Sequence, residues 1–286
     1  MTKKFEWQNL SNDEIERHFN PRVAVPDAQR FIDNYTSKSL KARKKIEGTY
    51  DIRYGPNTKQ TLDLHIPKSI ENPPLLFYIH GGYWRALDKD EFTFVASSFL
   101  QEGIAVANIN YDLCPDVKLD ELVEEIVSAF HFCKEKVDEW GIQGVYLMGH
   151  SAGSHLVAEL LRRDFYEDEK PKEVVKGAIL LTGIYEPEIA LNLGVNKEIQ
   201  LNAETASKCN VMRHPPLSNC PMIICAGANE PEGWIDQSMR YSKLCESKGI
   251  NTKFQLADDA HHFSLLDFAT DRTHPLFKQI IRFIKS

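Results

Sequence analysis

The sequence has no apolar run of the length that a membrane-spanning helix needs, which is about 18 residues or more. Its first residues, Met1 to Gln8, include two lysines but no apolar segment and no small-residue cleavage site, so we do not expect a secretory signal. The six cysteines include no Cys-x-x-Cys pair, and their spacing fits neither a zinc site nor a disulfide framework. These absences predict a cytoplasmic protein with reduced thiols and with no metal or other cofactor.

A strongly basic surface is also missing. The formal net charge is −7, which argues against a general nucleic-acid-binding role. The one basic cluster, Lys38 to Lys45, is interpreted as the solvated face of a helix. The pair Gly81-Gly82 lacks the continuation of a dinucleotide-binding loop. We expect a small-molecule substrate and no nucleic-acid or membrane partner; the oligomeric state stays open, with a homodimer as one option.

What the sequence does contain is a regular alternation of strand and helix patterns. The apolar run 74–79 is typical of a strand that is buried on both faces of a parallel sheet. We therefore expect an α/β fold with a mostly parallel, doubly wound sheet flanked by helices, and we interpret residues 1–286 as a single domain. The predicted strands cover 49–54, 62–66, 74–79, 104–109, 145–148, 177–181, 222–226 and 252–255; the predicted helices cover 90–101, 119–136, 154–163, 234–247 and 276–284.

Two segments fall outside this alternation. Residues 1–45 form a helical N-terminal extension, in which Ser11 and Glu14 have the spacing of a capping box and Asn20-Pro21 ends the first helix. A second helix is expected over 27–35. Residues 185–219 make a connection longer than usual, which we interpret as a small helical cap above the carboxyl ends of the strands. Whether the N-terminal helices also cover a cleft is left open by the sequence.

The motif Gly149-His150-Ser151-Ala152-Gly153 lies between a predicted strand and a predicted helix, which is the context of a nucleophile elbow. A serine nucleophile needs a base, and this fold places the base after the last strand. Two histidines follow that strand. We favour His262 over His261, because Phe263 can anchor the loop and leave the preceding imidazole facing the sheet edge.

The acid of the expected triad should follow the preceding strand, 222–226. Glu230 is the first carboxylate after that strand, and Glu232 and Asp236 are its rivals. The oxyanion hole should combine the N–H of Ala152 with N–H groups of Gly81 and Gly82, since residues without a Cβ let the backbone approach a substrate oxygen. His80 is expected to hold this loop through hydrogen bonds.

Taken together, these features resemble the α/β-hydrolase superfamily, in the branch with a His-Gly-Gly oxyanion loop, and within it the kynurenine formamidases (arylformamidases). The resemblance spans nearly the whole chain, and one departure from it is Glu230, where the family usually has aspartate. Its most specific parts are the N-terminal segment and His-Gly-Gly-Tyr-Trp. It is carried by Trp7 to Ser11 with Phe19-Asn20-Pro21, His80 to Trp84 with Lys89-Asp90-Glu91, Gly149 to Leu156, Gln237-Ser238 and His262-Phe263.

The resemblance implies hydrolysis of N-formylkynurenine to kynurenine and formate, a step of tryptophan breakdown. Tyr83 and Trp84 are expected to contact the substrate by crowding a narrow acyl pocket, and Arg85 and the cap are nearby candidates for polar anchors. A general small-acyl carboxylesterase with the same triad is the first alternative. A non-catalytic binding protein with a hydrolase fold is the second.

Overall fold

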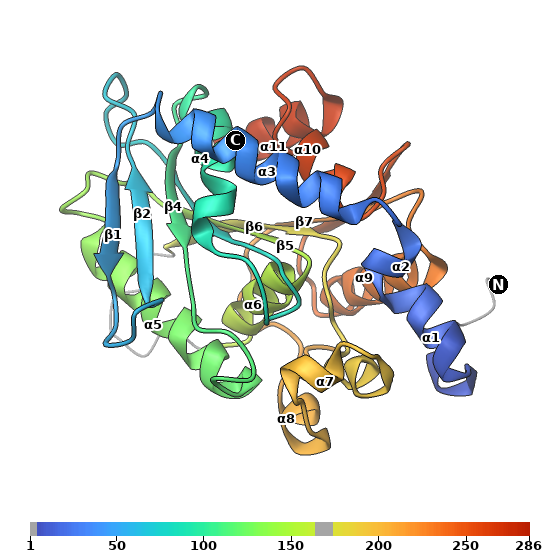
Figure 1. Ribbon diagram of the computed structural model, residues 1–286. Coiled ribbons are helices and arrows are strands. Elements are labelled where there is room, and N and C mark those ends of the chain that lie inside the picture. The colour runs from blue at the N-terminus through green and yellow to red at the C-terminus, as the bar shows by residue number, and fades with distance from the viewer. Residues whose placement is uncertain (1–4, 164–173) are drawn as a thin grey trace.

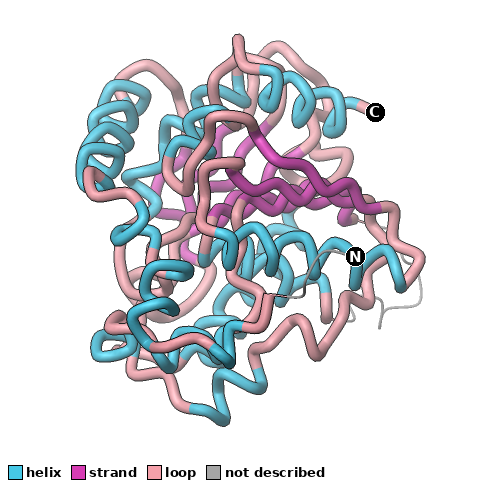
Figure 2. The backbone as a smooth tube through the Cα atoms, turned by 90° about the vertical axis from the view of Figure 1, so that its right-hand side faces the viewer, coloured by secondary structure: helices cyan, strands magenta, loops and turns pink. Residues whose placement is uncertain are grey.

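The computed structural model describes residues 5–163 and 174–286. A sheet of eight strands runs through this part of the chain with helices on both sides (Figures 1 and 2). The strands are β1 (Thr49–Arg53), β2 (Thr61–His65), β3 (Leu75–Ile79), β4 (Ala105–Ile109), β5 (Val145–His150), β6 (Val175–Leu181), β7 (Met222–Gly227) and β8 (Thr252–Ala257). Their order is β1-β2-β4-β3-β5-β6-β7-β8. The two pairs that involve β2 are antiparallel, and the other pairs are parallel.

The helices follow the strands in the order that a doubly wound sheet requires. The α-helices are α1 (Asn12–Phe19), α2 (Pro21–Ala24), α3 (Ala28–Arg43), α4 (Thr93–Leu100), α5 (Leu119–Lys136), α6 (Ala152–Leu161), α7 (Asn196–Ile199), α8 (Ala203–Lys208), α9 (Glu232–Ser247), α10 (Ser264–Phe268) and α11 (Pro275–Lys285). Short 3-10 helices are η1 (Trp7–Asn9), η2 (Lys89–Phe92) and η3 (Pro187–Asn192).

Strand β3 illustrates how the sheet separates two apolar layers. Its alternate residues Leu75, Phe77 and Ile79 belong to the core that includes α5, α6 and α9. Leu76 and Tyr78 belong to the core on the opposite face, with α3, α4 and α11. All five are fully buried, which explains the continuous apolar sequence of the strand. No helix in the described part of the chain is long and apolar enough to cross a membrane.

The N-terminal extension differs from its prediction in two ways. The capping box of Ser11 and Glu14 is present and α1 ends before Asn20-Pro21 as predicted, but Pro21 also begins a short helix, α2, that was not predicted. Helix α3 continues to Arg43, eight residues beyond the predicted end at Tyr35, because its inner face stays apolar or small as far as Ala42. The first four residues of the extension lie outside the described residues.

The basic cluster is not simply a solvated helix face, which corrects its interpretation. It covers the last turns of α3, where two of its cations meet carboxylates of other elements. Lys38 Nζ lies 2.7 Å from a carboxylate oxygen of Asp267, and a guanidinium nitrogen of Arg43 lies 2.8 Å from one of Asp90. The cluster therefore helps to hold α3 against α10 and η2.

Candidate active site

Ser151 occupies the turn at which β5 ends and α6 begins. Its φ of 56° and ψ of −121° lie in a region that residues other than glycine rarely adopt. Close backbone approach requires a glycine on each side. A Cβ on Gly149 would lie 2.3 Å from the carbonyl carbon of Gly153, and a Cβ on Gly153 would lie 2.1 Å from the carbonyl oxygen of Ile79. The strand, tight turn and helix expected around Ser151 are therefore all present.

Side chains from the carboxyl ends of three parallel strands meet at this turn. His262 Nε2 lies 3.0 Å from Ser151 Oγ, and His262 Nδ1 lies 2.8 Å from Glu230 Oε1. All three residues are buried. Because Nδ1 faces a carboxylate, the hydrogen-bond network assigns the proton to Nδ1, which leaves Nε2 to accept from the serine hydroxyl. The structure thus brings together the predicted nucleophile, base and acid.

The carboxylate of Glu230 is held at both oxygens. Oε1 accepts from His262 Nδ1 and from the hydroxyl of Thr182, which follows β6. Oε2 accepts from the N–H of Gly227 at 2.8 Å. Thr182 is fully buried with a φ of 44°, rare for a β-branched residue, and its N–H donates to the carbonyl of Cys225 at 2.7 Å. Sequence reasoning missed Thr182, because a lone threonine after a strand carries no recognisable signal.

The rival candidates lie in other surroundings. His261 Nδ1 accepts from the N–H of Ser264 at 3.3 Å, at the start of α10. Glu232 is the exposed first residue of α9. Asp236 accepts from Arg240 Nε at 2.6 Å. Within the described chain, none of the three rivals is hydrogen-bonded to the serine or to the buried histidine.

Two aromatic neighbours fix the position of His262. The ring of Trp234 lies 4.5 Å from the imidazole of His262, centroid to centroid. His150 Nε2 donates to the carbonyl of His262 at 2.8 Å. Burial, reinforced by the nearby His262, lowers the pKa of His150 to about 3, so His150 is neutral at pH 7. Neither residue was expected to take part from the sequence.

The glycine-rich loop after β3 passes directly beside the serine. A Cβ on Gly81 would lie 3.1 Å from Ser151 Cβ, and Gly82 has a φ of 120°, which only glycine adopts freely. Ala152 is the first residue of α6, where a backbone N–H has no partner within the helix. Gly81 and Ala152 therefore adjoin Ser151, and Gly82 follows Gly81 in the same loop; their function as an oxyanion hole stays a prediction.

His80 braces the start of this loop from behind. Its Nδ1 lies 2.7 Å from the carbonyl oxygen of Gly81, and its Nε2 lies 3.3 Å from Oδ1 of Asn110. The ring of Tyr111 stacks on the imidazole at 4.4 Å, centroid to centroid. Burial lowers the pKa of His80 to about 4, so the residue is neutral at pH 7. These contacts agree with the expectation that His80 holds the loop through hydrogen bonds.

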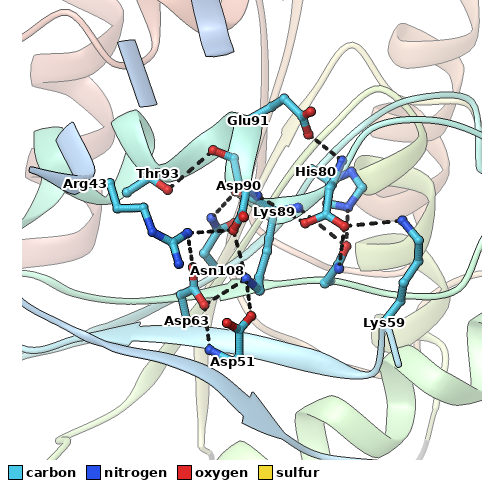
Figure 3. A network of polar contacts seen from close by, with 12 residues as sticks. Arg43, Asp51, Lys59, Asp63, His80, Lys89, Asp90, Glu91, Thr93 and Asn108 are labelled. Atoms are coloured by element: carbon cyan, nitrogen blue, oxygen red, sulfur yellow. Dashed lines mark hydrogen bonds and ion pairs between the residues drawn. The ribbon is translucent and has the colours of Figure 1, made fainter. Parts of the chain in front are cut away.

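An ion-pair group with a buried centre fixes the far end of the loop (Figure 3). Lys89 Nζ lies 2.8 Å from a carboxylate oxygen of Asp51 and 2.9 Å from oxygens of Asp63 and of Asp90. The Lys89 side chain is 2% exposed and that of Asp63 is 0% exposed. Arg43 of α3 also reaches Asp63, at 3.7 Å. We call Lys89, Asp51, Asp63, Asp90 and Arg43 the Lys89 cluster.

Ser151 and His262 open onto a cavity of about 280 Å³. The walls come from four segments that are far apart in the sequence: the N-terminal extension, the glycine-rich loop, the cap and the loop of His262. The open question about the N-terminal helices is thereby answered, since they form one wall. Within the described residues, no group of three or more His, Cys, Asp or Glu side chains could hold a metal ion. The lining residues are Asn20, Pro21, Arg22, Ile32, Tyr35, Gly81, Gly82, Tyr83, Arg85, Ala86, Leu87, Phe92, His150, Ser151, Gly194, Val195, Glu198, His262 and Phe263.

The two aromatic residues expected to contact the substrate are separated by the fold. Tyr83 lines the cavity. Trp84 is fully buried beneath it, with its indole ring 5.1 Å from the ring of His155. Both residues have positive φ, 53° and 60°, and this turn directs Trp84 into the core. The expectation of a substrate contact is therefore corrected for Trp84, which instead supports the loop.

Comparisons with known proteins agree with this architecture. A family model described as BD-FAE matches residues 62–163. The kynurenine formamidase of Danio rerio is 30% identical to this chain over 98% of both proteins. This chain belongs to the kynurenine formamidase family. The kynurenine formamidase of Salmo salar is 27% identical over 96% of this chain and 97% of its own length. An esterase of Pyrobaculum calidifontis, with 18% identity, superimposes with a TM-score of 0.69 over 96% of both chains.

Membership of this family confirms the resemblance and, with it, the expectation of an arylformamidase. The mostly parallel eight-stranded sheet and the esterase neighbour confirm the α/β-hydrolase fold. The chain is thus a hydrolase of this superfamily.

Proposed function

We propose that this chain hydrolyses N-formyl-L-kynurenine to L-kynurenine and formate, with Ser151, His262 and Glu230 as its catalytic triad. The observation that carries the proposal is the hydrogen-bonded series from Ser151 Oγ through His262 to Glu230, at 3.0 and 2.8 Å, at the wall of a cavity. It is supported by the similarity to two kynurenine formamidases that match nearly the whole chain.

In the first step, Ser151 Oγ attacks the formyl carbon while His262 Nε2 takes the hydroxyl proton. The negative charge on the formyl oxygen is received by backbone N–H groups of Gly81, Gly82 and Ala152. His262 then returns the proton to the aniline nitrogen as the C–N bond breaks. This leaves a formyl ester on Ser151 and releases kynurenine.

In the second step, water attacks the formyl ester. His262 takes a proton from the water, the oxyanion forms again, and collapse of the intermediate expels Ser151 Oγ, which recovers its proton. Formate is the second product. Glu230 keeps the Nδ1 proton in place throughout and stabilises the imidazolium that forms in each half of the reaction.

The cavity walls support a small acyl group and an aromatic leaving group. Tyr83, Leu87, Phe92 and Phe263 supply apolar or aromatic surface beside the serine, and about 280 Å³ of space suits a small substrate. We include the N-terminal extension (1–45) and the cap (185–219) in one catalytic domain, residues 1–286, because both contribute to the same walls.

The test is turnover of N-formyl-L-kynurenine by the wild type and by Ser151→Ala, followed through free kynurenine. Turnover that is lost in the variant is the expected result. A wild type that cleaves p-nitrophenyl acetate but leaves N-formyl-L-kynurenine intact would keep the triad and replace the proposal with a general small-acyl carboxylesterase. A wild type inactive on both would favour a binding protein.

A further inference from the structure

Arg85 places a cation on the cavity wall, although the proposed formyl transfer needs none there. The residue follows Trp84 in the glycine-rich loop, and its side chain is 20% exposed. One terminal nitrogen lies 2.7 Å from Oε2 of Glu198, which belongs to α7 of the cap. The Nε–H of Arg85 is buried and has no hydrogen-bond partner among the described residues. The Nε–H of this guanidinium can therefore still donate a hydrogen bond to an acceptor.

The shape of the group suggests which acceptor fits. A guanidinium presents Nε–H and a terminal N–H along one edge, and this edge matches the two oxygens of a carboxylate. Buried N–H groups in proteins are almost always paired, and Arg85 lines the cavity, so a ligand bound there would explain its unpaired Nε–H. The fork geometry also favours a carboxylate over a single carbonyl oxygen.

The charged side chains of the cavity walls suit a zwitterionic ligand, with one negative and one positive group. Arg22 and Arg85 are the cationic side chains of the cavity, and Glu198 is its carboxylate. Glu198 uses Oε2 for Arg85, and its side chain is 59% exposed, so Oε1 stays accessible. Glu16 lies close by, but both of its oxygens are engaged, by the N–H of Gly194 and by Nδ2 of Asn20.

We propose that Arg85 and Glu198 form the site for an α-amino-acid group on the substrate, Arg85 binding its carboxylate and Glu198 its ammonium. The inference rests on the proposed function for the reacting group, and it adds the part of the substrate that the triad does not touch. One anchor lies on the oxyanion loop and the other on the cap, so a bound amino-acid group bridges the two segments.

Direct binding tests this without any turnover. L-Kynurenine carries the amino-acid group, and 2-aminoacetophenone is an aminophenyl ketone that lacks it. In calorimetric titrations of the wild type, L-kynurenine should bind at least about tenfold more tightly. Arg85→Met should remove most of that ratio, and Arg85→Lys should restore only part of it, because lysine keeps the charge but not the fork.

Two further variants separate a local effect from a general one. Glu198→Gln, at a more exposed position, should also lower the ratio. Arg272→Met breaks a comparable ion pair, Arg272 to Glu102 at 2.8 Å, outside the cavity lining, and should keep the wild-type ratio. Equal affinities of the wild type for both ligands, no measurable binding of L-kynurenine, or an undiminished ratio in Arg85→Met would overturn the proposal.

Kinetics then tell this inference apart from the proposed function. N-Formyl-L-kynurenine is compared with 2-formamidoacetophenone, which has the same reacting group without the amino acid. The ratio of kcat/KM for the two should fall in Arg85→Met, mainly through KM. A wild type that cleaves both formamides equally well would contradict the amino-acid site at Arg85 and Glu198 and would leave the proposed formamidase activity intact. A wild type that cleaves neither formamide but binds L-kynurenine as expected would contradict the proposed activity and would support the amino-acid site.

Discussion

Two polar groups with buried centres flank the glycine-rich loop, and they are built for different purposes. In the Lys89 cluster, the lysine ammonium is surrounded by three carboxylates. In the Ser151 cluster, which we define as Ser151, His262, Glu230 and Thr182, the hydrogen bonds form a single series that ends at the serine hydroxyl. The first group does not line the cavity, whereas Ser151 and His262 do.

The contrast teaches how a rigid support and a reactive centre can share one loop. The charges of the Lys89 cluster are paired with one another and do not reach the cavity, so the cluster can stabilise the backbone but cannot contact a substrate. In the Ser151 cluster, the hydrogen bonds end at the serine hydroxyl, which faces the cavity and is therefore accessible to a substrate. Variants in the Lys89 cluster should therefore lower stability first, and variants in the Ser151 cluster should lower turnover while leaving the fold intact.

The largest loss should come from His262→Ala. Removing one member of a serine triad has lowered kcat by about 10⁶-fold in another hydrolase, because the members act as a unit. His261→Ala is the matched control next to it, and it should keep turnover, since His261 only caps the start of α10. The measurement is kcat for both variants on one substrate. A dead His261→Ala with an active His262→Ala would reverse the assignment of the base.

Glu230→Gln should come next, with turnover reduced by about 10⁴-fold. The amide keeps the size of the side chain but no longer stabilises the imidazolium. Thermal unfolding should stay close to that of the wild type, which separates this effect from misfolding. Near-normal turnover would transfer the role to Glu232 or Asp236.

Lys89→Met should act on stability. It leaves the carboxylate of Asp63 buried with Arg43 as its remaining cation, and breaking a buried ion pair costs about 3–5 kcal/mol of unfolding free energy. Urea denaturation measures the change. Adding Asp63→Asn removes the stranded charge and should recover part of the loss. A Lys89→Met protein as stable as the wild type would contradict the supporting role.

Stability should also fall in mild acid. Burial lowers the pKa of His80 and His155 to about 4 and that of His150 to about 3. In the unfolded chain these residues bind protons near pH 6.5, so the stability they contribute is present above that pH and is lost as pH falls toward 4. Each of these histidines should lower the unfolding free energy by on the order of 1 kcal/mol per pH unit within this window. Urea denaturation at pH 7, 6 and 5 tests this, and His155→Gln should reduce the slope.

The smallest effect should come from Thr182→Val. This variant keeps the β-branched shape and removes the hydroxyl that donates to Glu230. We expect kcat to fall roughly tenfold with little change in KM, since one hydrogen bond to a charged group is lost. Thr182→Ser keeps the hydroxyl and should recover most of the rate. Equal rates in the valine and serine variants would show that the hydroxyl has no part in catalysis.

The sequence predicted best where the signal is local. The elbow at Ser151 depends on glycines that lie within two residues of it, and Phe263 anchors the loop of His262 as the sequence suggested. The ring of Phe263 is buried against Val25, Ala28 and Ile32 of the N-terminal extension, and its carbonyl accepts from the hydroxyl of Tyr35. The anchoring of that loop was thus foreseen, but its partner was not.

What could not be predicted depends on contacts between distant segments or on backbone details. Nothing in the local pattern of residues 20–35 shows that they face Ser151. The two consecutive positive φ values at Tyr83 and Trp84 cannot be recognised in the sequence. The prediction that the Trp84 side chain contacts the substrate was therefore wrong. The oxyanion donors, the cytoplasmic location and the homodimer stay predictions.

The contact between Tyr35 and the loop of His262 has a consequence for how the enzyme is made. Ser151 leaves the ribosome 111 residues ahead of the histidine that we propose as its base. A nascent chain can therefore assemble β3, β4 and β5 around a serine that is still inert. The helix that carries Tyr35 emerges earlier still and must wait for Phe263. Hydrolytic activity should accordingly appear in one step, when the last strand and the loop after it reach the sheet.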